Sequence, residues 1–147
     1  KLTNLESEEP FPLNNFCTGI IKFAKTREIR SKITTAIQLL ADNADPTEAA
    51  SELKLSQRAD ETIPFAIYCF LKYRKSFQKS LYCAILNGGD KDTLGSITGS
   101  LSGAYLGKKA ISEEWLKRIE NREYLESLAK QLVRLDDSVV RSSSGTQ

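Results

Sequence analysis

Residues 87–107 read NGGDKDTLGSITGSLSGAYLG and decide the fold class. Leu94, Ile97 and Leu101 recur with the spacing of one helical face. The glycines of the stretch recur four apart, at Gly95, Gly99, Gly103 and Gly107. Because each glycine costs a helix about 1 kcal/mol relative to alanine, a stripe of them needs a physical reason. We expect a buried helix, with the backbone of another helix close against its glycine face.

The same period recurs through most of the chain, and no segment of convincing length alternates with the period of a strand. The expected N-caps include Asp45, with Pro46 in the first helical position, and Ser112. A nearly all-apolar central helix is expected over 59–73, with Pro64 in its first turn. The other expected helices cover about 26–42, 46–53, 77–85, 92–107, 113–119 and 125–135. The predicted fold class is all-α.

Length and composition predict one domain. The chain has 147 residues, of which 40% are hydrophobic, enough for one core and too few to promise two. We expect a linker or extended arm over residues 1–15, the helical part of a single domain over 16–137, and a polar tail over 138–147. The chain contains no methionine and begins at Lys1, so we expect further sequence before it.

Charge and hydropathy point away from two classes of partner. The 21 basic and 19 acidic residues are interspersed and give a net charge of +2, so we expect no direct binding to nucleic acid or to an anionic membrane. The longest apolar stretch, 63–71, is far shorter than the roughly 20 residues of a spanning helix, and no signal peptide opens the chain. We expect an intracellular protein of the cytoplasm or nucleus.

The cysteine and histidine content restricts the possible chemistry. Cys17, Cys69 and Cys83 are odd in number and lack C-x-x-C spacing, so we expect buried reduced thiols. The chain has no histidine, which excludes a Ser/His or Cys/His pair and most zinc sites. Any metal ion should therefore be hard and bound by oxygen.

One run, 88–93, gathers several oxygen donors where a helix begins. In a structural interpretation, Asp92 caps the glycine-striped helix and Asp90 is favoured by the positive helix end. In a functional interpretation, Asp90 and Asp92 are carboxylate ligands of Mg²⁺, with the Thr93 hydroxyl beside them. An EF-hand is excluded, because Leu94 and Leu101 stand where its third oxygen ligand and closing glutamate would be. Spacing alone leaves the two interpretations open.

At this run the sequence resembles a known family. Residues 88–95, continued by Gly99 and by 103–107, resemble the C-terminal signature of the ADP-ribosylglycohydrolase family, a G-G-D-T-D-T motif that opens a glycine-rich helix ending in G-A-Y-x-G. The segment 61–71, with Glu61 three residues before Pro64, is similar to the branch that contains the ADP-ribosylserine hydrolases.

The resemblance implies an all-α, compact, orthogonal multi-helix bundle that binds two Mg²⁺ ions and hydrolyses the glycosidic bond of an ADP-ribosyl group on a protein side chain or in ADP-ribose polymer. It implies that Asp90, Asp92 and Thr93 are metal ligands. The other ligands, the acid/base glutamate and the adenine-binding loops would lie in an N-terminal part of the same domain, outside this chain. No catalytic residue is assigned here, and this chain alone is expected to be inactive.

Two positions depart from the family pattern. Lys91 stands where the family usually has threonine, and it could point outward or compete with Mg²⁺ for the carboxylates. We expect the outward orientation. Ser56 stands where relatives often carry glycine. The alternatives to a hydrolase are a catalytically inactive structural or ADP-ribose-binding relative, as in crystallins that resemble this family, and a helical interaction module in which the aspartates only cap.

Overall fold

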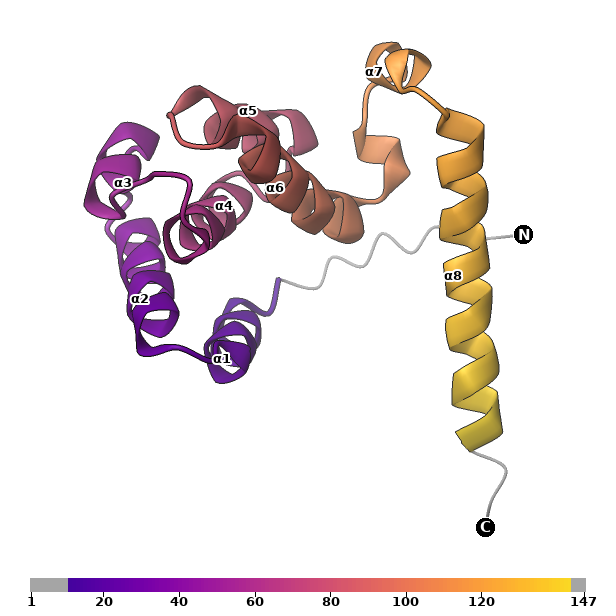
Figure 1. Ribbon diagram of the computed structural model, residues 1–147, viewed down its shortest axis with the longest axis horizontal. Helices are drawn as coiled ribbons and strands as arrows, with labels where there is room; N and C mark the ends of the chain where they lie inside the picture. Colours follow the sequence, from indigo (N-terminus) through magenta and orange to yellow (C-terminus); the bar gives the residue numbers. More distant parts are fainter. Residues whose placement is uncertain (1–10, 144–147) are drawn as a thin grey trace. The chain divides into compact units, whose positions relative to one another are not determined.

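The computed structural model describes the backbone of residues 11–143 and the side chains of residues 11–134. Within that part every regular element is helical, which confirms the all-α prediction (Figure 1). The elements are α1 Leu13–Phe23, α2 Arg27–Ala41, α3 Pro46–Glu52, α4 Ala59–Lys72, α5 Phe77–Leu86, α6 Lys91–Leu106, the 3-10 helix η1 Lys108–Ala110, α7 Glu113–Arg118 and α8 Arg122–Ser143.

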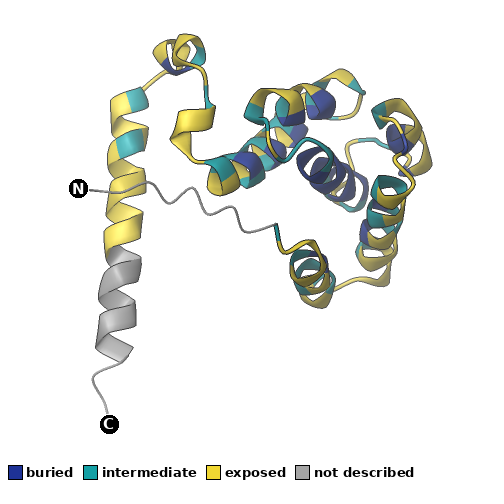
Figure 2. Ribbon diagram, turned by 180° about the vertical axis from the view of Figure 1, so that it is seen from behind, coloured by how far each residue is buried: buried dark blue, intermediate teal, exposed yellow. Residues whose placement is uncertain are grey.

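The chain divides into two compact units, residues 1–110 and 111–147. In the first unit α4 is the central helix, and α2, α5 and α6 pack against it. Residues 64–71 of α4 are all buried, as Figure 2 shows by their dark colour. The second unit consists of α7 and α8. The expectation of a single domain over 16–137 stays a prediction.

The core of the first unit forms two clusters on different faces of α4. One contains Phe65, Tyr68 and Cys69 together with residues of α2, α3, α5 and α6. The other contains Ile67, Phe70 and Leu71 together with residues of α1 and α2. Since α4 is apolar nearly all round, it can serve both clusters, as expected of a central helix. All three cysteines are buried and free, as predicted.

Local capping chemistry starts most of these helices. Asp45 accepts hydrogen bonds from the N–H groups of Thr47 and Glu48 at 2.8 and 3.0 Å, and Pro46 takes the first helical position. Ser112 accepts from the N–H of Trp115 at 3.3 Å. Both predicted caps are confirmed, and each leaves fewer unpaired N–H groups in its first turn.

Several boundaries differ from the sequence prediction. α1 begins at Leu13, inside the expected arm. The apolar residues that bury one face of α1 follow residue 15, so the arm itself showed no helical pattern. Residues 1–10 lie outside the described part. α8 continues to Ser143, past the expected start of the polar tail, since extending a formed helix costs little. α4 begins at Ala59 as expected, but Pro64 comes five residues later and therefore lies in the second turn rather than the first.

The glycine stripe of α6 receives side chains, which corrects the expectation of a close backbone. A Cβ at Gly95 would lie 3.4 Å from Ile85 Cγ2, and one at Gly103 would lie 3.8 Å from the Phe77 ring. Both neighbours belong to α5. The stripe is therefore a shallow groove that seats large side chains of α5. Gly107 lies outside the stripe and caps α6 at φ +72°.

Candidate functional site

The candidate site begins at the turn between α5 and α6. α5 ends at Leu86, and Asn87 caps it. Gly88 and Gly89 then adopt φ of +97° and +69°, a region that residues with a Cβ rarely enter. A Cβ at Gly89 would also lie 2.8 Å from Leu55 Cγ, so Leu55 occupies the space that a side chain would need. The two glycines reverse the chain and place Asp90 at the start of α6.

Asp90, not Asp92, is the N-cap of α6. Its Oδ1 accepts from the N–H of Thr93 at 3.2 Å, and its Oδ2 accepts from the Thr93 hydroxyl at 2.6 Å. The structural interpretation was therefore wrong in placing the cap at Asp92, because the positive-φ glycines already start the helix two residues earlier. The hydroxyl and N–H of Thr93 lower the pKa of Asp90, so the carboxyl is ionised at neutral pH.

The three predicted ligand residues lie on one helical turn. Asp92 and Thr93 are exposed in the first turn of α6, and Asp90 is half-buried before it. Two carboxylates and a hydroxyl are oxygen donors of the kind that hard cations take, and each carboxylate oxygen can bind a second partner. In the described part of the chain no three His, Cys, Asp or Glu side chains form a group that could hold a metal ion. The donor set fits part of a Mg²⁺ site, and the ion stays a prediction.

Lys91 does not close over these donors. Its side chain is exposed. No ion pair within the described residues joins it to Asp90 or Asp92, and the Asp90 side chain carries the hydrogen bonds of the cap. This arrangement agrees with the expected outward orientation of Lys91.

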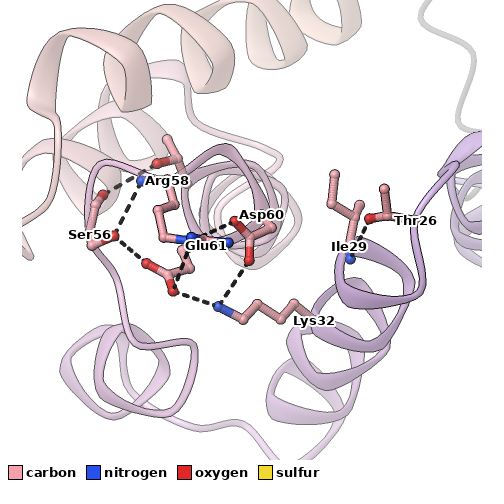
Figure 3. Close-up of polar contacts among 8 residues, drawn as sticks. Thr26, Ile29, Lys32, Ser56, Arg58, Asp60 and Glu61 are labelled. Atoms are coloured by element: carbon pink, nitrogen blue, oxygen red, sulfur yellow. Dashed lines mark hydrogen bonds and ion pairs between the residues drawn. The ribbon is translucent and has the colours of Figure 1, made fainter.

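A second polar cluster surrounds the start of α4 (Figure 3). Lys32 from α2 donates to Glu61 Oε1 at 2.9 Å and lies 3.7 Å from Asp60 Oδ2. The Ser56 hydroxyl donates to Glu61 Oε2 and accepts from the Arg58 N–H. Hydrogen bonds from Ser56 and then from Lys32 lower the pKa of Glu61, which is only 9% exposed. Ser56 and Lys32 therefore hold Glu61 as an anion, each at one of its two carboxylate oxygens.

Direct contacts connect the two clusters. Leu55, next to Ser56, packs under Gly89, next to Asp90. Thr47 at the start of α3 lies 3.4 Å from Asn87 Oδ1, measured from its hydroxyl oxygen. The turn before α4 and the turn before α6 thus support each other, and carboxylates follow directly after both.

Sequence reasoning identified one of these clusters and missed the other. Asp90, Asp92 and Thr93 were recognisable because they lie within four residues of each other, behind two glycines. Lys32 was missed, since its partner Glu61 is 29 residues away in the sequence and a single lysine on an amphipathic helix gives no signal. The contact between Leu55 and Gly89 was invisible for the same reason.

The sequence of this chain matches a known family and is similar to several known proteins. The family model for ADP-ribosylglycohydrolase matches residues 8–140. The chain is similar to ADP-ribosylhydrolase ARH3 of Homo sapiens, with 36% identity over 108 residues that cover 65% of this chain and 30% of the relative. It is also similar to the protein of that name from Mus musculus, with 33% identity over 120 residues that cover 74% of this chain and 32% of the relative.

The chain spans less than a third of the length of these curated relatives. No solved structure matches it. Within the described residues no helix is both long enough and apolar enough to cross a membrane.

Proposed function

This chain belongs to the ADP-ribosylglycohydrolase family, and we propose that it is the C-terminal part of a hydrolase that removes ADP-ribose from modified protein side chains or cleaves ADP-ribose polymer. The observation that carries the proposal is the turn at Gly88 and Gly89, which gathers Asp90, Asp92 and Thr93 at the exposed start of α6. Similarity to ADP-ribosylhydrolase ARH3 supports the substrate class.

The role of these residues is to hold Mg²⁺ and to fix its position. Asp90 would contribute a carboxylate that the Thr93 N–H and hydroxyl orient. Asp92 would contribute a second carboxylate from the first turn of α6. Bound Mg²⁺ would supply positive charge that orients the ribose hydroxyls and stabilises negative charge developing on the leaving oxygen. The remaining ligands and the acid/base group come, in this proposal, from the N-terminal part of the same domain.

An apolar groove supports a role as one part of a larger domain. A hollow of about 750 Å³ opens between α1 and α2, lined by Phe16, Ile20, Phe23 and Ile29 among others. The Phe23 side chain is 84% exposed. Exposed aromatic side chains beside an apolar hollow mark surfaces that another element covers. The N-terminal part of the domain is the partner that we propose for it.

The proposal is tested on the complete protein with an ADP-ribosylated peptide as substrate. Asp90→Asn and Asp92→Asn keep the side-chain shape but remove a charge, and each should lower Mg²⁺-dependent hydrolysis by about 100-fold or more. Asp42→Asn is the matched control, because Asp42 is an exposed aspartate at the other end of a helix, and this variant should keep full activity.

Two other results would change the conclusion. ADP-ribose binding that is independent of Mg²⁺, without hydrolysis, would favour the inactive ADP-ribose-binding relative. Full activity in both aspartate variants would remove these residues from the metal site. Calorimetric titration with Mg²⁺ and with ADP-ribose separates the two cases, since it measures binding apart from turnover.

A further inference from the structure

Two cysteines from neighbouring helices meet in the core. Cys69 lies on α4 and Cys83 on α5, and the Cys83 thiol donates a hydrogen bond to the Cys69 sulfur over 2.8 Å. Both belong to the same apolar cluster. A disulfide has a sulfur–sulfur distance of about 2.05 Å, so the two sulfurs need to approach by less than about 1 Å to bond. The helices are therefore already placed for a cross-link.

The two sulfurs differ in access. Cys69 is fully buried, whereas Cys83 keeps 6% exposure. Cys83 lines a hollow of about 390 Å³ together with Tyr73, Lys79 and Leu86. Burial raises the pKa of the Cys69 thiol. A small oxidant that enters the hollow therefore reaches Cys83 first, since Cys69 does not line the hollow.

We propose that Cys69 and Cys83 are a redox site, in which a hydroperoxide oxidises the pair to a reversible disulfide that joins α4 to α5. Cys83 sulfur attacks the terminal peroxide oxygen, the O–O bond breaks, and the rest of the peroxide leaves as water or alcohol after taking up a proton. Cys83 is then a sulfenic acid. Cys69 sulfur attacks Cys83 sulfur, the S–S bond forms, the S–O bond breaks, and water leaves with the Cys69 proton. The two thiols lose two electrons, and the peroxide gains them.

The site acts on the turn that carries the candidate ligands. Asn87 donates from its side-chain amide to the Cys83 carbonyl oxygen at 2.7 Å, and Asn87 is the residue directly before Gly88 and Gly89. A covalent bond at Cys83 therefore fixes the last turn of α5, from which the chain continues to Asp90. Oxidation should restrict the opening motions of this turn, and reduction by a thiol should restore them.

The experiment begins with the protein as purified and fully reduced. It is treated with hydrogen peroxide, free thiols are alkylated, and intact mass and peptide maps are recorded before and after a thiol reductant. Before alkylation, we expect the mass to fall by that of two hydrogen atoms. After alkylation, peptides holding Cys69 and Cys83 should be joined, and Cys17 should carry the alkyl group. The disulfide closes a loop between residues 69 and 83, so the melting temperature should rise by on the order of 10 °C and fall again on reduction.

Single variants identify the order of reaction. Cys69→Ser should stop at a sulfenic acid on Cys83, trapped by dimedone, and Cys83→Ser should not form the joined peptides. Cys17→Ser is the matched control, since Cys17 is buried in the other core cluster, and it should oxidise like the unchanged protein. The map of the unchanged protein decides the matter even where a variant folds poorly. A disulfide through Cys17, or peroxide treatment that leaves Cys69 and Cys83 both alkylatable, would overturn the proposal.

Discussion

Replacing Gly89 by alanine should destabilise the fold more than any other single methyl addition in the turn before α6. Gly89 has φ +69°, and holding a residue with a Cβ in the left-handed region costs roughly 1–2 kcal/mol. The new Cβ would also lie 2.8 Å from Leu55 Cγ, the branch point of that side chain. Overpacking of this kind costs typically about 1–3 kcal/mol. The sum predicts a loss of about 2–5 kcal/mol in the free energy of unfolding.

A double-mutant cycle separates the two contributions. Leu55→Ala removes the atoms that the new methyl meets, so Gly89→Ala should cost less in that background, with a coupling energy of about 1–3 kcal/mol. The left-handed backbone cost should remain. Gly88→Ala is the control, because a Cβ at Gly88 meets nothing within 4 Å, and its cycle with Leu55→Ala should be additive.

Urea unfolding followed by circular dichroism at the helical minimum measures each corner of both cycles. Equal m-values across the variants would show that the free energies can be compared. An additive Gly89–Leu55 cycle would refute the packing argument, since the cost would then come from the backbone alone.

Further predictions concern the core and the carboxylates. Tyr68→Phe should lower the free energy of unfolding by about 1 kcal/mol, because the buried hydroxyl donates to the Ala44 carbonyl; Tyr105→Phe, on an exposed ring, should have a smaller effect in the same urea assay. Thr98→Val should raise it by up to about 1 kcal/mol, since the Thr98 hydroxyl is buried without a hydrogen-bond partner in the described part; no gain in urea would contradict this. Hydrogen bonds from Ser56 and Lys32 lower the pKa of Glu61 in the fold, so their contribution to stability is present above its ordinary pKa of 4.5 and is lost as pH falls through the folded value. The free energy of unfolding of Lys32→Met should therefore be lower than that of the unchanged protein near neutral pH. In urea titrations carried out in acid, the two free energies should converge.

The sequence alone determined the features that depend on neighbours within one or two turns. The helical period, the caps at Asp45 and Ser112 and the grouping of Asp90, Asp92 and Thr93 were all predictable, because the interacting atoms are two to four residues apart. Family resemblance rested on the same local run. The glycine stripe of α6 was also visible in the sequence, since its glycines recur at a fixed spacing.

Tertiary structure decided which distant residues meet. Three contacts join residues of different helices or different turns: Lys32 with Glu61, Leu55 with Gly89, and Cys69 with Cys83. Each helix face offers several possible partners for such contacts. Packing of α2, α5 and α6 on α4 selects one of them, because it buries the apolar faces of these helices against one another. The cap at Asp90 was decided in the same way: Leu55 fills the space beside Gly89, and the backbone there turns into the helix before it reaches Asp92.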